Sequence, residues 1–290
     1  MANEERPVAV LGLGGMGHGM AASALRAGIP TVVWNRSPRR TADLAEAGAR
    51  VADSVADAAG RADIAVTMVT DADAVRSLAV DQGMLAALPD GAIWAQMSTI
   101  GVAATEQLAA LVRERRPDVT FLDAPVAGSR APAEAGKLLV LASGPDEARP
   151  RVAPLFDAVG QRTLWLGPAG TGSRMKLVNN ILLAFLAEGL GEAVALGREL
   201  GLEASAVAEA FGGGPLASPW ISGKLQRMAK GDYSPEFPLA LAFKDVRLAM
   251  DEIDPDRFVV GACLASQWRR AMDRGFGDQD VTAVARAIES

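Results

Sequence analysis

The sequence has very little cysteine and histidine: each occurs once in 290 residues. With Cys263 alone, the chain can form no intrachain disulfide framework and no zinc cluster built on cysteines. The one histidine, His18, lies just inside a glycine-rich segment, where we expect a bland structural role rather than Ser/His/Asp catalysis or metal ligation. The composition therefore indicates a reducing compartment, with the cytoplasm as the expected location, and no bound metal.

Excess basic charge and long hydrophobic runs are also missing. Lys and Arg total 29 against 35 Asp and Glu, and the net charge of −6 disfavours nucleic acid as a partner. The most apolar stretch, 177–187, contains Asn179 and Asn180 and is shorter than the roughly 18 to 20 apolar residues that a membrane span needs. We therefore expect a buried helix there and no membrane partner.

From Pro7 to about Gly167, short β-branched runs alternate with alanine-rich amphipathic segments, the pattern of βαβ units in a parallel sheet. A helix is predicted over 102–115. Strands are predicted over 8–11, 31–34, 63–69, 92–96, 120–123, 138–142 and 163–166.

Beyond the turn at 167–172 the strand pattern stops. One helix is predicted over 173–200, and further helices over 204–211, 220–230, 239–252 and 258–274. The predicted fold class is α/β: a Rossmann-type doubly wound parallel sheet followed by an all-α domain. We place a dinucleotide-binding domain at 1–168 and an all-α substrate and dimerisation domain at 169–290.

A glycine motif follows the first predicted strand and opens a helix. A tight turn needs Gly12, close approach of a pyrophosphate needs Gly14, and helix–strand packing needs Gly17, while the helix N-terminus attracts the anion. The strand–turn–helix context makes a dinucleotide site the preferred interpretation over a mere glycine-rich turn. The predicted loop consists of Gly12, Leu13, Gly14, Gly15, Met16 and Gly17.

The end of the second strand indicates which dinucleotide binds. An acidic residue there would bind the ribose hydroxyls of NAD, but the chain has Asn35, followed by Arg36 and Ser37. A guanidinium pairs with a 2'-phosphate, so NADP(H) is predicted. At least one of Arg39 and Arg40 is expected to be a solvated residue of a helix start, so Arg36 and Ser37 carry the prediction.

Lys176 and Asn180 stand four residues apart in the long predicted helix, so they share one face and can act on one substrate. A helical lysine is more often a solvated charge. The apolar surroundings favour the other interpretation, because a desolvated ammonium has a lowered pKa and can exchange a proton near neutral pH, as hydride transfer to or from an alcohol carbon requires.

Several stretches together resemble the β-hydroxyacid dehydrogenases, the family of 3-hydroxyisobutyrate dehydrogenase. The resemblance runs in order along nearly the whole chain. Within the family, the segments 35–37, 128–134 and 237–239 look most like the branch of glyoxylate/succinic semialdehyde reductases, which prefers NADPH. The stretches that carry the resemblance are the loop 12–17, Asp123-Ala124-Pro125-Val126-Ala127-Gly128-Ser129 with Ala135-Gly136, Gly170-Thr171-Gly172 leading to Lys176 and Asn180, and Lys244-Asp245.

The resemblance implies a role for each matching residue. Lys176 is the general acid/base and Asn180 holds the substrate. Lys244 reaches the cofactor from the helical domain, and Asp245 supports the catalytic pocket. The nicotinamide end of the cofactor is bordered by Met68, Val69 and Thr99, and the substrate stretch comprises Ala127, Gly128, Ser129 and Phe237.

One departure concerns the substrate. The family usually has a serine that bonds the substrate carboxylate where this chain has Ala127, and loss of that hydroxyl weakens or redirects recognition of small carboxylates. Ser129 and backbone amides can compensate. The expected substrate is a small carbonyl compound, such as a semialdehyde, or a β-hydroxyacid.

Two alternatives stay open. The first is that the protein is one of the related imine reductases. These typically lack the lysine, which disfavours this alternative, but Ala127 is compatible with it because it loosens the requirement for a carboxylate. The second is a non-catalytic dinucleotide-binding module, which retention of Lys176 disfavours. The resemblance also implies a homodimer or homotetramer that assembles through the helical domain.

Overall fold

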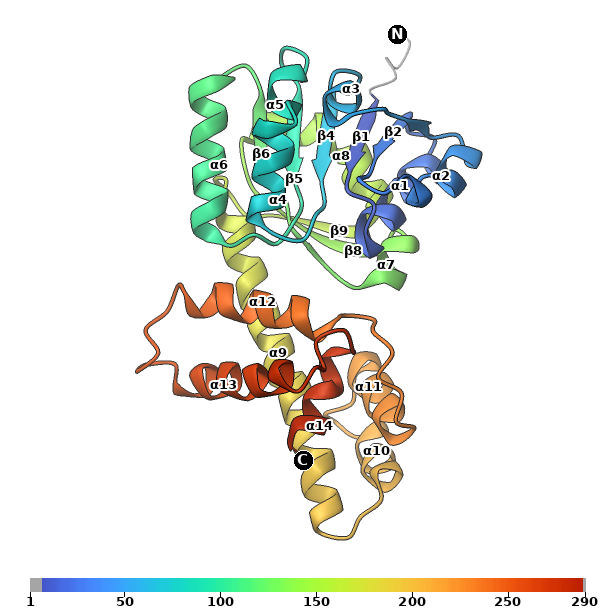
Figure 1. Ribbon diagram of the computed structural model, residues 1–290, viewed down its shortest axis with the longest axis vertical. Coiled ribbons are helices and arrows are strands. Elements are labelled where there is room, and N and C mark those ends of the chain that lie inside the picture. The colour runs from blue at the N-terminus through green and yellow to red at the C-terminus, as the bar shows by residue number, and fades with distance from the viewer. Residues whose placement is uncertain (1–6, 289–290) are drawn as a thin grey trace. The chain divides into compact units, whose positions relative to one another are not determined.

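The structure, a computed structural model, describes residues 7–288. The chain divides into two compact units, the first ending at Lys176 and the second beginning at Leu177. Figure 1 shows strands and helices alternating along the first unit, and helices along the second.

Within the described residues, the first unit contains a six-stranded parallel sheet in the order β3-β2-β1-β4-β5-β6. The chain moves from β1 to one side and then returns to the other, which places the topological switch point between β1 and β4. The strands are β1 (Val8–Leu11), β2 (Thr31–Trp34), β3 (Arg50–Val51), β4 (Ile64–Thr67), β5 (Ile93–Gln96) and β6 (Thr120–Asp123).

Helices cover both faces of this sheet because its strands are apolar on both sides. Along β1, Val8 and Val10 pack into one core with α1 and α8, while Ala9 and Leu11 pack into the opposite core with α3, α5 and α6. This is the arrangement that strands buried on both faces require. The helices are α1 (Gly15–Arg26), α2 (Ala42–Glu46), α3 (Val55–Ala59), α4 (Ala72–Arg76), α5 (Met84–Ala87), α6 (Val102–Arg115), α7 (Arg130–Glu134) and α8 (Arg149–Val159).

The last strands of the first unit leave the parallel sheet and form a smaller mixed one. Its members are β7 (Val126–Ala127), β8 (Leu138–Ala142) and β9 (Gly160–Trp165), with β7 antiparallel and β9 parallel to β8. A single bridge between Asp123 and Ser143 links the end of β6 to the end of β8. The chain also forms the short helices η1 (Pro38–Arg40), η2 (Ser77–Asp81), η3 (Asp146–Ala148) and η4 (Val281–Ala283).

The second unit consists of helices among its described residues, as predicted. Trp268 and Leu264 of α13 pack against α12 and the middle of α9 in one core, and Val194 joins α10 and α11 in another. The fold class is therefore confirmed. The helices are α9 (Thr171–Glu199), α10 (Ala204–Gly212), α11 (Pro219–Ala229), α12 (Leu239–Met250), α13 (Val259–Asp273) and α14 (Val284–Ile288).

The long helix α9 is only partly buried, whereas the sequence predicts a buried helix over 177–187. It has 29 residues, and by length and composition it is apolar enough to cross a membrane, with 44% of its most apolar window buried inside the protein. The core helix of a soluble protein passes the same test, so this is weak evidence for a membrane span. Its buried positions include Lys176, Asn180 and Glu188. A helix that buries three such side chains has a protein-facing side that is partly polar.

Candidate functional site

The loop between β1 and α1 has the geometry that each of its glycines permits. Gly12 has φ +99°, and a Cβ there would collide with the Met68 carbonyl and lie 2.6 Å from Cγ1 of Val69. A Cβ at Gly17 would collide with the carbonyl of Gly12, so helix and strand could not approach as closely. Apart from Gly14 and its chain neighbours, no heavy atom of the described residues lies within 4 Å of a Cβ built at Gly14, so there is open space at this position of the loop.

The N-terminus of α1 has the properties of an anion site. Gly14 is the N-cap residue in extended conformation, and no side chain of the described residues caps the helix. The first amide groups and the positive end of the helix dipole therefore face that open space. These features fit a dinucleotide pyrophosphate bound by backbone groups.

The residues after β2 brace the glycine loop. The Leu13 amide donates to Oδ1 of Asn35 at 2.9 Å, and the Asn35 amide donates to the Ser37 carbonyl at 3.0 Å. Arg40 donates to the Leu13 carbonyl at 3.1 Å. Asn35 thus holds the loop, and Arg40, which was set aside in favour of Arg36 and Ser37, contacts the loop itself. Arg36 and Ser37 are exposed just beyond it.

Nε2 of His18 lies 2.8 Å from a carboxylate oxygen of Asp43, within hydrogen-bond distance. This hydrogen bond with His18 is the largest influence on Asp43 and lowers the pKa of its carboxyl group. The contact links α1 to α2, which is a structural role of the kind expected for this histidine.

The loops after β4 and β5 are tied together beside Gly12. The Val69 amide donates to Oγ of Ser98 at 2.9 Å, and the Ser98 hydroxyl lies 3.2 Å from the Thr67 carbonyl. The buried side chain of Gln96 accepts from the Ser98 amide at 2.8 Å. Ser98 therefore fixes the backbone between Val69 and the predicted cofactor residue Thr99. Sequence reasoning missed this serine, since only the folded sheet brings it to Val69.

The predicted substrate stretch follows β6 and returns toward the glycine loop. Ala127 pairs with Leu139 in the small sheet, and Gly128, at φ +133°, leaves only 2.7 Å between a built Cβ and Cδ2 of Leu138. Ser129 is the N-cap residue of α7, and its side chain makes no capping bond to the described residues. The side chain of Arg130 lies 3.9 Å from a Cβ built at Gly15. The structure therefore brings Arg130, at the end of this stretch, next to Gly15 of the loop 12–17.

Lys176 is buried on α9, with 8% of its surface exposed, and Asn180 follows one turn later with 4% exposed. The Asn180 amide donates to Oδ2 of Asp245 at 2.5 Å and accepts from Asn179 at 2.9 Å. Nζ of Lys244 lies 2.8 Å from Oδ1 of Asp245. Asp245 is therefore held between the amide of Asn180 and the ammonium of Lys244, and it fixes the orientation of Asn180.

Phe237 lies in the second unit, half-buried against the core that contains Trp268. Its amide donates to Oδ2 of Asp280 at 3.3 Å. Asp280 also accepts from the buried Lys224 at 2.9 Å. The backbone at Phe237 is thus fixed by a buried ion pair.

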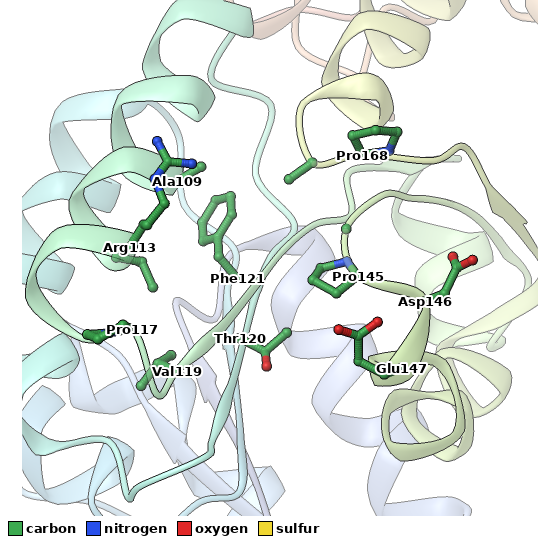
Figure 2. A pocket seen from close by; sticks show the side chains of 13 residues that line it. Ala109, Arg113, Pro117, Val119, Thr120, Phe121, Pro145, Asp146, Glu147 and Pro168 are labelled. Atoms are coloured by element: carbon green, nitrogen blue, oxygen red, sulfur yellow. The ribbon is translucent and has the colours of Figure 1, made fainter.

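A separate groove of about 700 Å³ lies at the free edge of β6. Figure 2 shows Phe121 between Arg113 on α6 and Pro145, with the carboxylates of Asp146 and Glu147 beyond. Its lining contains none of the predicted site residues. This groove is therefore distinct from the glycine loop.

Comparison with known proteins places both halves of the chain in described families. Residues 7–167 match the family described as the NAD binding domain of 6-phosphogluconate dehydrogenase. Residues 170–288 match the family described as NAD-binding of NADP-dependent 3-hydroxyisobutyrate dehydrogenase.

Individual relatives match over nearly their whole length. Glyoxylate/succinic semialdehyde reductase 1 of Arabidopsis thaliana is 31% identical, covering 97% of this chain and 98% of the relative. The NAD-dependent L-serine dehydrogenase of Pseudomonas aeruginosa is 34% identical, covering 98% of each. The crystal structure of 3-hydroxyisobutyrate dehydrogenase from Salmonella typhimurium has a TM-score of 0.88 at 28% identity, covering 97% of this chain and 99% of that one.

Proposed function

The chain belongs to the 3-hydroxyisobutyrate dehydrogenase-like family of β-hydroxyacid dehydrogenases, and on this premise we propose that it is an NADP(H)-dependent oxidoreductase. It interconverts the carbonyl group of a small semialdehyde or related acid and the corresponding alcohol. The observation that carries the proposal is a buried lysine, Lys176, in a chain whose loop 12–17 has the geometry of a dinucleotide cradle.

The cofactor preference follows from the end of β2. Asn35 is neutral and braces the glycine loop, so no carboxylate there repels a 2'-phosphate. Arg36 is exposed immediately after it and supplies a guanidinium that pairs with phosphate. These features support NADP(H), even though one relative is named as an NAD-dependent enzyme.

The chemistry divides between cofactor and side chains. When bound, the nicotinamide supplies or accepts the hydride. Lys176 gives a proton to the substrate oxygen during reduction and takes it back during oxidation. Asn180 orients that oxygen toward Lys176 from the next helical turn, and Asp245 holds the Asn180 amide in position.

The substrate stretch supports small polar substrates without a strict carboxylate requirement. Ala127 offers no hydroxyl, while Ser129 has a hydroxyl that is not used to cap α7. A site with fewer fixed donors discriminates less against substrates that lack a carboxylate. Reduction of C=N bonds is therefore the second candidate activity, favoured by Ala127 and disfavoured by Lys176.

The test is NADPH oxidation measured against a panel of aldehydes, keto acids and cyclic imines. We expect turnover with small aldehydes or semialdehydes that is lost in Lys176→Met. Activity confined to imines would favour the imine-reductase alternative. Stoichiometric NADPH binding without turnover of any compound would favour the non-catalytic module.

We further propose that the protein is soluble, cytoplasmic and a homodimer or homotetramer assembled through its helical unit. On α9, Val178 and Leu182 are about 60% exposed and Leu186 and Leu196 continue the same face, which is more apolar surface than an isolated helix usually leaves in water. Sedimentation should show an oligomer at micromolar concentration, and Leu182→Glu should dissociate it. A monomer in the unmodified protein would contradict this assembly.

A further inference from the structure

The first turn of α9 is held by one buried carboxylate. Asp123, at the end of β6, is fully buried and accepts hydrogen bonds from the Ser173 amide at 2.8 Å and the Gly170 amide at 3.1 Å. The hydroxyls of Ser173 and Ser143 also lie within hydrogen-bond distance of this carboxylate, at 2.7 and 3.1 Å. Two segments of the first unit, the start of α9 and the residue that follows β8, therefore meet at Asp123 on β6.

The contacts around Asp123 fix where α9 starts. The Gly172 amide donates to Oγ of Ser143 at 3.0 Å. A Cβ at Gly172 would collide with the Leu141 carbonyl and lie 2.8 Å from that of Asp123, so the helix backbone lies directly against the ends of β6 and β8. The α9 start can then neither slide along its axis nor turn about it without breaking several of these contacts.

The fixed position of the α9 start determines where Lys176 points. It lies three residues after Ser173 and four after Gly172, so it shares a helix face with the residues that contact the strand ends. Each residue of an α-helix turns about 100° and rises 1.5 Å, so a shift of one residue would swing the lysine away from its direction. The carboxyl ends of parallel strands are also where ligands of open α/β sheets bind.

We propose that Asp123 is a positioning residue for Lys176: by capping the first turn of α9 it sets the direction of the reacting ammonium group. This inference rests on the proposed function, in which Lys176 exchanges a proton with the substrate. Asp123 itself touches neither substrate nor cofactor in this proposal.

The capping bonds also explain how the charge is tolerated. Burial raises the pKa of the Asp123 carboxyl group, and hydrogen bonds from Ser173, Ser143 and Gly170 oppose that rise. The positive end of the α9 dipole adds favourable charge at the same point. The hydrogen bonds and the helix start therefore offset part of the cost of burying the carboxylate.

The test compares turnover in Asp123→Ala and Asp123→Asn on the best carbonyl substrate. The alanine variant loses every capping bond, and we expect turnover to fall about 10- to 100-fold, since a misplacement of about 1 Å can cost 100-fold. Asparagine can keep an oxygen facing the two amides and offer its N–H to the Ser173 hydroxyl, so it should retain turnover within about threefold, because these hydrogen bonds survive. Loss in both variants would assign the effect to the charge and overturn the proposal.

A double-variant cycle separates positioning from general damage. In a Lys176→Met background, Asp123→Ala should cause no further loss of turnover, because the group it positions is already gone. Losses that multiply would overturn the proposal. The control is Ser54→Ala, which removes the cap of α3, a 3.0 Å bond from the Asp57 amide, and should lower thermal stability without changing turnover.

Two further measurements keep the outcomes distinguishable. If Asp123→Ala fails to fold, Ser143→Ala removes only the Gly172 bond and one donor to Asp123, and should still lower turnover severalfold with NADPH affinity unchanged. Wild-type turnover in that variant would overturn the proposal. If instead Lys176→Met keeps full reductase activity, the proposed function fails before Asp123 is tested.

Discussion

Helices α1 and α9 both begin beside the carboxyl ends of strands in the first unit, but their N-termini are built in opposite ways. The α1 start has a glycine N-cap, no capping side chain among the described residues, and open space at Gly14. The α9 start is filled by Asp123, which accepts from the Ser173 and Gly170 amides inside the protein.

The difference shows two uses of the same helix dipole. A bare N-terminus leaves amides and positive potential for an external anion, so it suits a cofactor that must come and go. In a capped N-terminus these amides bond to a side chain of the same protein, and the helix start is thereby held in a fixed position. The site thus combines a loop suited to binding with a helix suited to holding Lys176 still.

The largest expected effect is a loss of turnover without a loss of cofactor binding, which separates the role of α9 from that of the glycine loop. Lys176→Ala should cut turnover about 10²- to 10⁴-fold, the usual contribution of general acid catalysis, while NADPH affinity stays close to the original. Steady-state kinetics and fluorescence titration measure the two quantities. Lys230→Ala, an exposed lysine in the second unit, is the control. A Lys176→Ala enzyme that keeps most of its reductase activity would show that another group moves the proton.

Much of the fold could be predicted from the sequence. The bounds of β1, β2, β6 and β8 coincide with the predicted strands, since each is an apolar run that the chain interrupts sharply, and α6 coincides with the predicted helix. The two-residue strands β3 and β7 were not predicted. Arg50 and Val51 are both exposed, so β3 has no apolar pattern, and β7 is too short for any periodicity.

The candidate site was predictable where neighbours in sequence form it, as in the glycine loop. It was not predictable where the contacts join distant segments. The Ser98 hydroxyl meets the Val69 amide across 29 residues, and Asp123 meets Ser173 across 50. The sequence does not distinguish Arg39 from Arg40, because a cluster of arginines gives no sign of which one turns back to the Leu13 carbonyl. Such contacts follow from sheet order and loop paths, which no local pattern encodes.

A substitution at Gly14 should convert the start of α1 into one that resembles the start of α9. Gly14 has φ −67° and ψ −170°, which an L-residue adopts freely, and aspartate is a favourable N-cap. In Gly14→Asp the NADPH dissociation constant should rise at least about 100-fold, since like charges about 4 Å apart repel by roughly 4 kcal/mol near a protein surface.

The melting temperature of Gly14→Asp without cofactor should not fall. Gly14→Asn caps the helix without a charge, and it should lose less NADPH affinity than Gly14→Asp. If Gly14→Asp bound NADPH as tightly as the unmodified protein, the pyrophosphate could not lie at the start of α1.

The third prediction concerns the far end of the same cofactor. Arg36→Ala should raise the NADPH dissociation constant at least about tenfold, because charge-assisted hydrogen bonds contribute roughly 1.5 to 3 kcal/mol. NADH, which lacks the 2'-phosphate, should bind nearly as before. Titration of both cofactors into both proteins tests this, with Arg39→Ala as a neighbouring control. Tighter binding of NADH than of NADPH to the unmodified protein would refute the assignment.

The smallest expected effect is on the pH dependence of stability, and it contrasts Asp123 with Asp280, a carboxylate that has a cation beside it. Burial would raise the pKa of Asp280, but its hydrogen bond and charge interaction with Lys224 outweigh burial, and the pKa is lowered. An unfolded aspartate titrates near 3.9, so Asp280 contributes stability above that pH which is lost as pH falls through its lower folded pKa. For Asp123 the folded pKa is raised, so protonation of its carboxyl group adds stability as pH falls toward 3.9 from above.

Urea unfolding between pH 7 and pH 2.5 distinguishes the opposite contributions that Asp280 and Asp123 make to the pH dependence of stability. Below about pH 4, Asp280→Asn should show a shallower loss of stability than the unmodified protein, by up to about 1.4 kcal/mol per pH unit for one proton. Asp123→Asn should differ from the unmodified protein mainly above pH 4, where it lacks the gain in stability on acidification. Because the two units can unfold separately, near-ultraviolet circular dichroism of Trp268 and Trp94, one buried in each unit, should follow each transition. Equal pH slopes in all three proteins would mean that neither carboxyl group changes its pKa on folding, and the contrast between a paired and a capping carboxylate would be wrong.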